Sequence, residues 1–165
     1  MKTCFRNLKR WPFATVLSAR KYGCDNIFAP HGAEQGSQLC MAILRGDNLE
    51  VGKLLAAGAP VDYQDEPDGW TPLIYSVYYR NPAARELLLE RNAAPDRSDF
   101  SGRTPLMVAA LVDDDASVRR LLAVGASAGN RDCRGKIALD FAREFRSRNC
   151  AALLEAARNT SEADQ

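Results

Sequence analysis

The chain has few of the side chains on which catalysis depends. Its only histidine is His31, in segment 30–32, which we expect to be a loop because it carries proline and glycine. A Ser/His/Asp or Cys/His system cannot be assembled around it. A Gly-x-x-x-x-Gly-Lys-Ser/Thr phosphate loop is also missing. We therefore expect neither an enzyme nor a small-molecule substrate.

The cysteines support neither a disulfide framework nor a metal site. There are five, an odd number, and no two form a Cys-x-x-Cys pair. Such cysteines are normally free thiols in a reducing compartment, and a structural zinc ion needs several Cys or His ligands in one neighbourhood. Segment 113–115, Asp-Asp-Asp, lacks the alternation and glycine of a calcium loop. We expect no metal or cofactor, a buried Cys40, and a cytoplasmic protein.

Long apolar runs and a strong net charge are missing as well. No apolar run approaches the ~18 residues of a membrane span, so none is predicted. The net charge is +1, which offers no electrostatic reason to expect nucleic-acid binding.

The charge is nevertheless unevenly distributed, because residues 1–24 hold six basic side chains and no acidic one. Three interpretations of residues 1–35 remain open. The first is a capping segment for the rest of the chain, which could have arisen from a decayed repeat. The second is a mitochondrial transit peptide, which is typically basic and poor in acids. The third is a disordered leader. The second is the alternative to a cytoplasmic location.

The sequence does contain an internal repeat of 33 residues. Gly-Trp-Thr-Pro-Leu at 69–73 recurs as Gly-Arg-Thr-Pro-Leu at 102–106, and in weaker form as Gly-Lys-Ile-Ala-Leu at 135–139. An earlier copy places Leu39 in the position of Leu73, an interval of 34, and we assign its extra residue to the turn 65–68. A period of this length indicates stacked units that bury apolar faces against one another.

Each unit contains the signals of two helices and a turn. Thr71-Pro72 and Asn81-Pro82 each combine an N-cap side chain with proline at the first helical position. Asn92 and, one unit later, Gly125 suit the left-handed conformation that ends a helix. The acids at 113–115 are expected to cap the next second helix. Equivalent positions on the first helices hold small residues that permit close stacking: Ala42, Ser76, Ala109 and Ala142.

This pattern resembles the ankyrin repeat, whose Thr-Pro-Leu signature stands here at 71–73 and 104–106. The resemblance covers about residues 36–157 and implies an all-α fold, an α-solenoid of about four helix-turn-helix repeats with projecting turns. Residues 1–35 form a basic extension in this division, and 158–165 a tail. The first and last copies depart from the signature, as terminal capping repeats do.

The resemblance also implies a function, which is to bind another protein on the concave face of the stack. The alternative is a regulatory or inhibitory subunit of an enzyme or transcription factor that uses the same surface. The family's contact positions fall here on large or basic side chains, of kinds enriched in binding hot spots. They are Arg45, Trp70, Tyr78, Tyr79, Phe100, Arg103, Leu111, Val112, Arg134 and Phe145.

Two mutational expectations follow from this register. Changing Trp70, Tyr78, Tyr79 and Phe100 to alanine should abolish partner binding with only a slight loss of stability, provided that these side chains are exposed. Leu106→Ala should instead destabilise the fold by about 2–5 kcal/mol, because Leu106 is expected between stacked helices.

Overall fold

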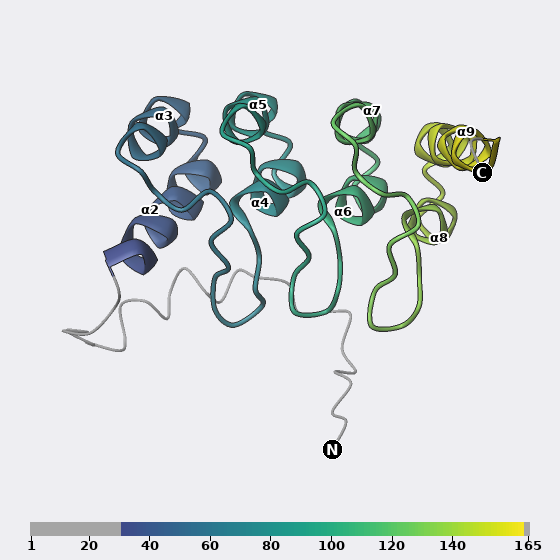
Figure 1. The fold of residues 1–165 in the computed structure, drawn as a ribbon, viewed down its shortest axis with the longest axis horizontal. Coiled ribbons are helices and arrows are strands. Elements are labelled where there is room, and N and C mark those ends of the chain that lie inside the picture. The colour runs from purple at the N-terminus through teal and green to yellow at the C-terminus, as the bar shows by residue number, and fades with distance from the viewer. Residues whose placement is uncertain (1–30, 164–165) are drawn as a thin grey trace, which may run out of the picture.

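A computed structural model describes residues 31–163, which form eight helices arranged in pairs (Figure 1). The pairs are α2 (His31–Arg45) with α3 (Asn48–Ala56), α4 (Pro72–Tyr78) with α5 (Pro82–Glu90), α6 (Pro105–Leu111) with α7 (Asp115–Ala123), and α8 (Ala138–Glu144) with α9 (Arg148–Ala163). We call these pairs repeats 1 to 4. The described part of the chain has no strand, and the fold is an α-solenoid, as predicted.

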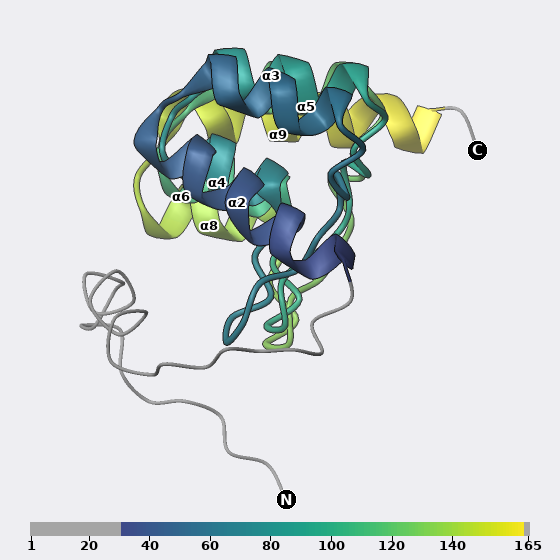
Figure 2. The same cartoon turned by 90° about the vertical axis from the view of Figure 1, so that its left-hand side faces the viewer.

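The helices lie in two layers. The inner helices α2, α4, α6 and α8 contact one another in series, and each packs against the outer helix of its own repeat. Figure 2 shows the two layers from the end of the stack, with the connecting turns projecting on the side of the inner helices. The predicted architecture of stacked helical pairs with projecting turns is therefore confirmed.

The helix ends follow the predicted caps. The side chains of Thr71, Asn81 and Asp114 accept hydrogen bonds from backbone N–H groups three residues later, and proline follows the first two. Asn92 has a φ of 60° and Gly125 a φ of 90°, so both take the left-handed conformation expected of them. These local signals lie in the sequence, which is why these boundaries of α4, α5 and α7 were predictable.

Two boundaries differ from expectation. Helix α2 begins at His31, so the prediction that segment 30–32 is a loop is wrong for His31 and Gly32. Helix α9 continues to Ala163, beyond residue 157, where the repeat domain was expected to end. The predictions for residues 1–24, including the targeting segment, lie outside the described residues.

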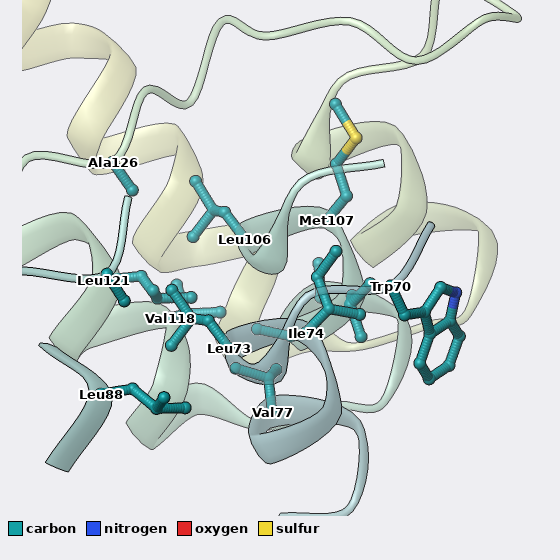
Figure 3. Close-up of a cluster of buried hydrophobic side chains, with 14 of the residues drawn as sticks. Trp70, Leu73, Ile74, Val77, Leu88, Leu106, Met107, Val118, Leu121 and Ala126 are labelled. Carbon is teal, nitrogen blue, oxygen red and sulfur yellow. The ribbon is translucent and has the colours of Figure 1, made fainter. Parts of the chain in front are cut away.

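The core consists of apolar side chains between neighbouring repeats (Figure 3). Leu73 and Val77 of α4, Leu106 of α6 and Leu121 of α7 are completely buried. The small residues of the inner helices, predicted from their equivalent positions, are also at most 5 % exposed, which allows the helices to approach closely. Cys40 is buried as predicted, and this burial raises the pKa of its thiol.

Candidate functional site

Three projecting turns form a continuous row along the stack. They are the first turn (62–70), the second turn (96–103) and the third turn (129–136), which lie next to one another in Figure 1. The N–H of Phe100 donates to the carbonyl oxygen of Asp68 at 3.0 Å, and that of Cys133 to the carbonyl oxygen of Ser101 at 2.9 Å. These backbone bonds between neighbouring turns hold the row in one arrangement.

An aspartate at the same position of each turn organises the loop from inside. Asp99 accepts hydrogen bonds from the N–H groups of Ser101 and Arg103, and its carboxylate lies 2.7 Å from the Arg103 guanidinium. Asp132 accepts the N–H groups of Arg134 and Lys136, and its carboxylate lies 3.2 Å from the Arg134 guanidinium. The carboxylates of Asp99 and Asp132 are almost wholly buried, so each guanidinium neutralises a charge that burial would otherwise make costly.

In the first turn, the corresponding carboxylate is hydrogen-bonded by other groups and not by an arginine. Asp65 accepts the N–H of Trp70 at 2.7 Å and the hydroxyl hydrogen of Tyr75. Burial raises the pKa of the Asp65 carboxyl, and these two hydrogen bonds oppose that rise. The equivalent hydrogen bonds join residues of different spacing, because Asp65 and Trp70 are five residues apart and Asp99 and Arg103 are four apart. The extra residue therefore lies in the first turn, as predicted.

A pocket of about 300 Å³ opens beside the turns, on the inner helices of repeats 2 to 4. Its lining residues are Trp70, Tyr78, Arg103, Val108, Leu111, Arg134, Phe141, Glu144 and Phe145. The walls are mainly aromatic and aliphatic, with charged groups among them. This is the composition of a binding site in which apolar area supplies affinity and a few polar groups supply orientation.

The pocket brings together six of the ten residues predicted as partner contacts. These are Trp70, Tyr78, Arg103, Leu111, Arg134 and Phe145. The remaining four lie elsewhere. Phe100 is 60 % exposed in the second turn, Tyr79 and Val112 follow the last residues of α4 and α6, and Arg45 ends α2, where it lines a separate pocket at the opposite end of the stack.

The expectation that Trp70 is exposed is wrong. Its side chain is only 4 % exposed and packs edge-on against Tyr75 and Tyr78, with ring centroids 5.1 and 5.0 Å away. Figure 3 shows it at the edge of the buried cluster, beside α4. The aromatic neighbours on α4 cover the indole, and spacing along the sequence does not reveal this. Trp70 therefore forms the floor of the pocket and part of the core at the same time.

Two wall residues, Val108 and Phe141, were not identified from the sequence. Phe141 is 2 % exposed, and the guanidinium of Arg134 and the ammonium of Lys136 lie 5.7 and 5.9 Å from its ring centroid, within the range of cation–π attraction. Val108 stands 33 residues after Tyr75, and Phe141 stands 33 residues after Val108; Tyr75 is partly buried and packs against the core. That offset was the signal that could have identified them.

Other kinds of site are missing from the part of the chain that the structure describes. Residues 31–163 hold no group of three or more His, Cys, Asp or Glu side chains arranged to bind a metal ion. None of the described helices has the length and apolar character needed to cross a membrane.

Comparison with known proteins identifies the repeats. A family model for three copies of the ankyrin repeat matches residues 39–132. Chicken (Gallus gallus) inversin is 30 % identical over 123 residues, which is 74 % of this chain and 11 % of inversin. Human SH3 and multiple ankyrin repeat domains protein 2 is 33 % identical over 124 residues, 74 % of this chain and 6 % of that protein.

A third similar protein is the mouse (Mus musculus) 2-5A-dependent ribonuclease, 35 % identical over 78 residues, 47 % of this chain and 11 % of the ribonuclease. The chain thus spans about a tenth or less of these curated relatives, so the similarity concerns their repeats and not their other parts.

Proposed function

The chain belongs to the ankyrin repeat family, whose repeats generally mediate protein–protein interaction, and on this premise we propose that it binds a partner protein through its pocket-bearing face. This face consists of the three turns and the inner helices α4, α6 and α8, and it corresponds to the concave face used in the family. The mechanism is binding by a preformed surface, with no chemical step.

One observation supports this proposal above the others. Six side chains selected because the family uses their positions for contacts line a single pocket across three consecutive repeats. They include tryptophan, tyrosine and arginine, the types most enriched in binding hot spots. Phe145 is 44 % exposed at the edge of this pocket, so a large apolar side chain there remains available to a partner.

A matched pair of variants tests the proposal. Phe145→Glu places a charge at the pocket, whereas Leu49→Glu places the same charge at an exposed leucine, 69 % exposed, on α3 of repeat 1. We expect affinity capture from the native cell, read by mass spectrometry, to retain a partner with the wild type and Leu49→Glu and to lose it with Phe145→Glu. If all three capture the same proteins, the working surface lies elsewhere.

The same surface would serve a regulatory or inhibitory subunit. Adding the chain to a captured enzyme or transcription factor separates these functions, because a simple adaptor leaves the partner's activity unchanged. We propose a cytoplasmic location, with mitochondrial delivery by residues 1–24 as the alternative. Fusing those residues to a fluorescent protein distinguishes the two.

A further inference from the structure

The formal charge changes sign along the row of turns. The first turn has four acidic residues and no basic one, the second has two of each, and the third has three basic residues and one acidic residue. Because backbone hydrogen bonds connect each turn to the next, this succession of charges is held in space beside the pocket. A partner that crosses all three turns therefore meets a negative end and a positive end.

The ends of the row carry charges that other described residues do not neutralise. Glu66 and Asp68 of the first turn are exposed, and neither forms a salt bridge with a described cation. In the third turn, the exposed Arg131 donates to the carbonyl oxygen of Gly135 at 2.8 Å and forms no salt bridge with a described carboxylate. These charges are available for a partner.

The charges that line the pocket itself are already paired within the chain. Each has a counter-charge from its own repeat, as the pairs Arg103–Asp99 at 2.7 Å, Arg134–Asp132 at 3.2 Å and Lys136–Glu144 at 2.6 Å show. A charged occupant would compete with these pairs and lose its own hydration. An uncharged apolar group gains the burial energy without either cost.

The size of the pocket limits what enters it. A volume of about 300 Å³ is at the lower end for ligand pockets, and the walls are mainly aromatic and aliphatic. It suits one large side chain, such as Phe, Trp or Leu, that packs against the rings of Tyr78 and Phe145.

We infer that the partner presents a segment with one large uncharged apolar residue, which enters the pocket, flanked by basic residues over the first turn and acidic residues over the third. This inference rests on the proposed function and adds the chemistry and direction of the bound segment. Because neighbouring helices pack 8–10 Å apart, the three turns span roughly 20 Å. A peptide of about 15 residues covers that distance even when helical.

Selection from a library of random peptides of about 15 residues, displayed on phage against the full chain, tests the inference. We expect a consensus with one Phe, Trp or Leu, Lys or Arg on one side and Asp or Glu on the other. In a selected peptide, changing the apolar residue to alanine should weaken binding roughly 10-fold to 100-fold. Affinity should also fall as salt is raised, because the flanking charges are exposed.

Two charge-reversal variants test the direction. With Glu66→Lys and Asp68→Lys combined, we expect the basic flank to disappear from the consensus. With Glu90→Lys, an exposed acid on α5 away from the turns, the consensus should remain. Retention of the basic flank in the double variant would overturn the inferred direction.

Failure of the inference can be told apart from failure of the proposed function. Peptides that bind the wild type and not Phe145→Glu, but show no apolar residue between opposite charges, overturn the inference and leave the proposed surface standing. Peptides that bind the wild type and Phe145→Glu equally count against the inference, and so does a selection in which no peptide is enriched. In either case, the cellular capture with Phe145→Glu decides the proposed function separately.

Discussion

At the scale of single residues, the turns depend on buried polar groups that are fully paired. Asp99 and Asp132 each place a carboxylate inside a loop, where backbone N–H groups and one arginine surround it. The sequence predicts Arg103 and Arg134 only as partner contacts. They also stabilise the turns. Removing either arginine would therefore disturb the loop structure as well as binding, and a binding experiment with such a variant would not separate the two effects.

Gly102 illustrates how closely the turns approach one another. Its φ is +78°, and a Cβ there would lie 3.2 Å from the Cα of Asp132 in the next turn. We expect Gly102→Ala to lower the free energy of unfolding by about 1–3 kcal/mol, through backbone strain and this contact. Urea denaturation measures the loss. Gly52→Ala is the control, because Gly52 lies within α3 with open space around it, so it should be neutral or stabilising. Equal effects would contradict the explanation.

The burial of Trp70 changes what its mutation should do. We expect Trp70→Ala to destabilise the fold by about 3–5 kcal/mol, because it removes a large side chain from the core. Leu49→Ala, at a position 69 % exposed, should stay within about 0.5 kcal/mol. Guanidinium chloride midpoints of both variants check this. A Trp70→Ala midpoint close to that of the wild type would restore the original expectation of an exposed contact residue.

At the scale of the elements, side-chain bonds between outer helices reinforce the apolar contacts of the stack. The amide of Asn81 donates to the side chain of Asn48 at 2.8 Å, which connects α5 to α3. Between α5 and α7, Arg85 donates to the hydroxyl of Ser117 at 2.5 Å, and Arg120 lies 2.7 Å from Glu86. Each repeat therefore orients the next by polar groups as well as by packing.

The Glu86 ion pair makes this connection dependent on pH. Burial alone would raise the pKa of Glu86, but Arg120 and Arg85 lower it below its ordinary value of 4.5. The unfolded chain therefore takes up this proton first as the pH falls. The stabilisation is present above pH 4.5 and is lost at lower pH, as the pH passes through the lowered pKa of the folded state.

We expect the wild type to exceed Glu86→Gln in stability at pH 7 by about 1 kcal/mol or less, since the pair is partly exposed. The difference should vanish in strong acid. Urea midpoints of both proteins, measured from pH 7 down to strong acid, give this difference in stability. The raised pKa of Asp65 has the opposite effect on the pH dependence, but both proteins contain Asp65, so its effect cancels in the comparison. A difference that does not depend on pH would show that Glu86 acts through packing alone.

At the scale of the whole molecule, each repeat buries its apolar face only against its neighbours, so the repeats depend on one another for stability. We expect a single unfolding transition. In a Trp11→Phe variant, Trp70 is the one remaining tryptophan, and it reports on repeat 2. Its fluorescence should change at the same urea concentration as the helical circular dichroism of the entire chain.

A core mutation in a different repeat completes this test. Leu106 of α6 is completely buried, and Leu106→Ala should cost about 2–5 kcal/mol. In the Trp11→Phe background, it should lower the Trp70 fluorescence midpoint and the circular dichroism midpoint together, although Trp70 lies in repeat 2. Movement of the dichroism midpoint alone would show that the repeats unfold independently, and unchanged midpoints would refute the register.

The fold was predictable because its signals are local and recur. A Thr-Pro pair begins α4 and α6, and left-handed residues follow α5 and α7. Even the weakened copy forms its helix, because Asp140 accepts the N–H of Ile137 at 3.0 Å, which is the half of a capping box that does not need the missing threonine. Short-range patterns of this kind depend little on the rest of the molecule.

The sequence by itself therefore determined the repeat, the caps of the central helices, the small residues of the inner helices and the side chains expected to contact a partner. Only the tertiary structure decided which of these side chains lie together in one pocket. The pocket draws on residues from Trp70 to Phe145, and the neighbouring rings of α4 bury the indole of Trp70. Spacing along a chain specifies which face a residue occupies, whereas exposure depends on the size and orientation of neighbours from other repeats.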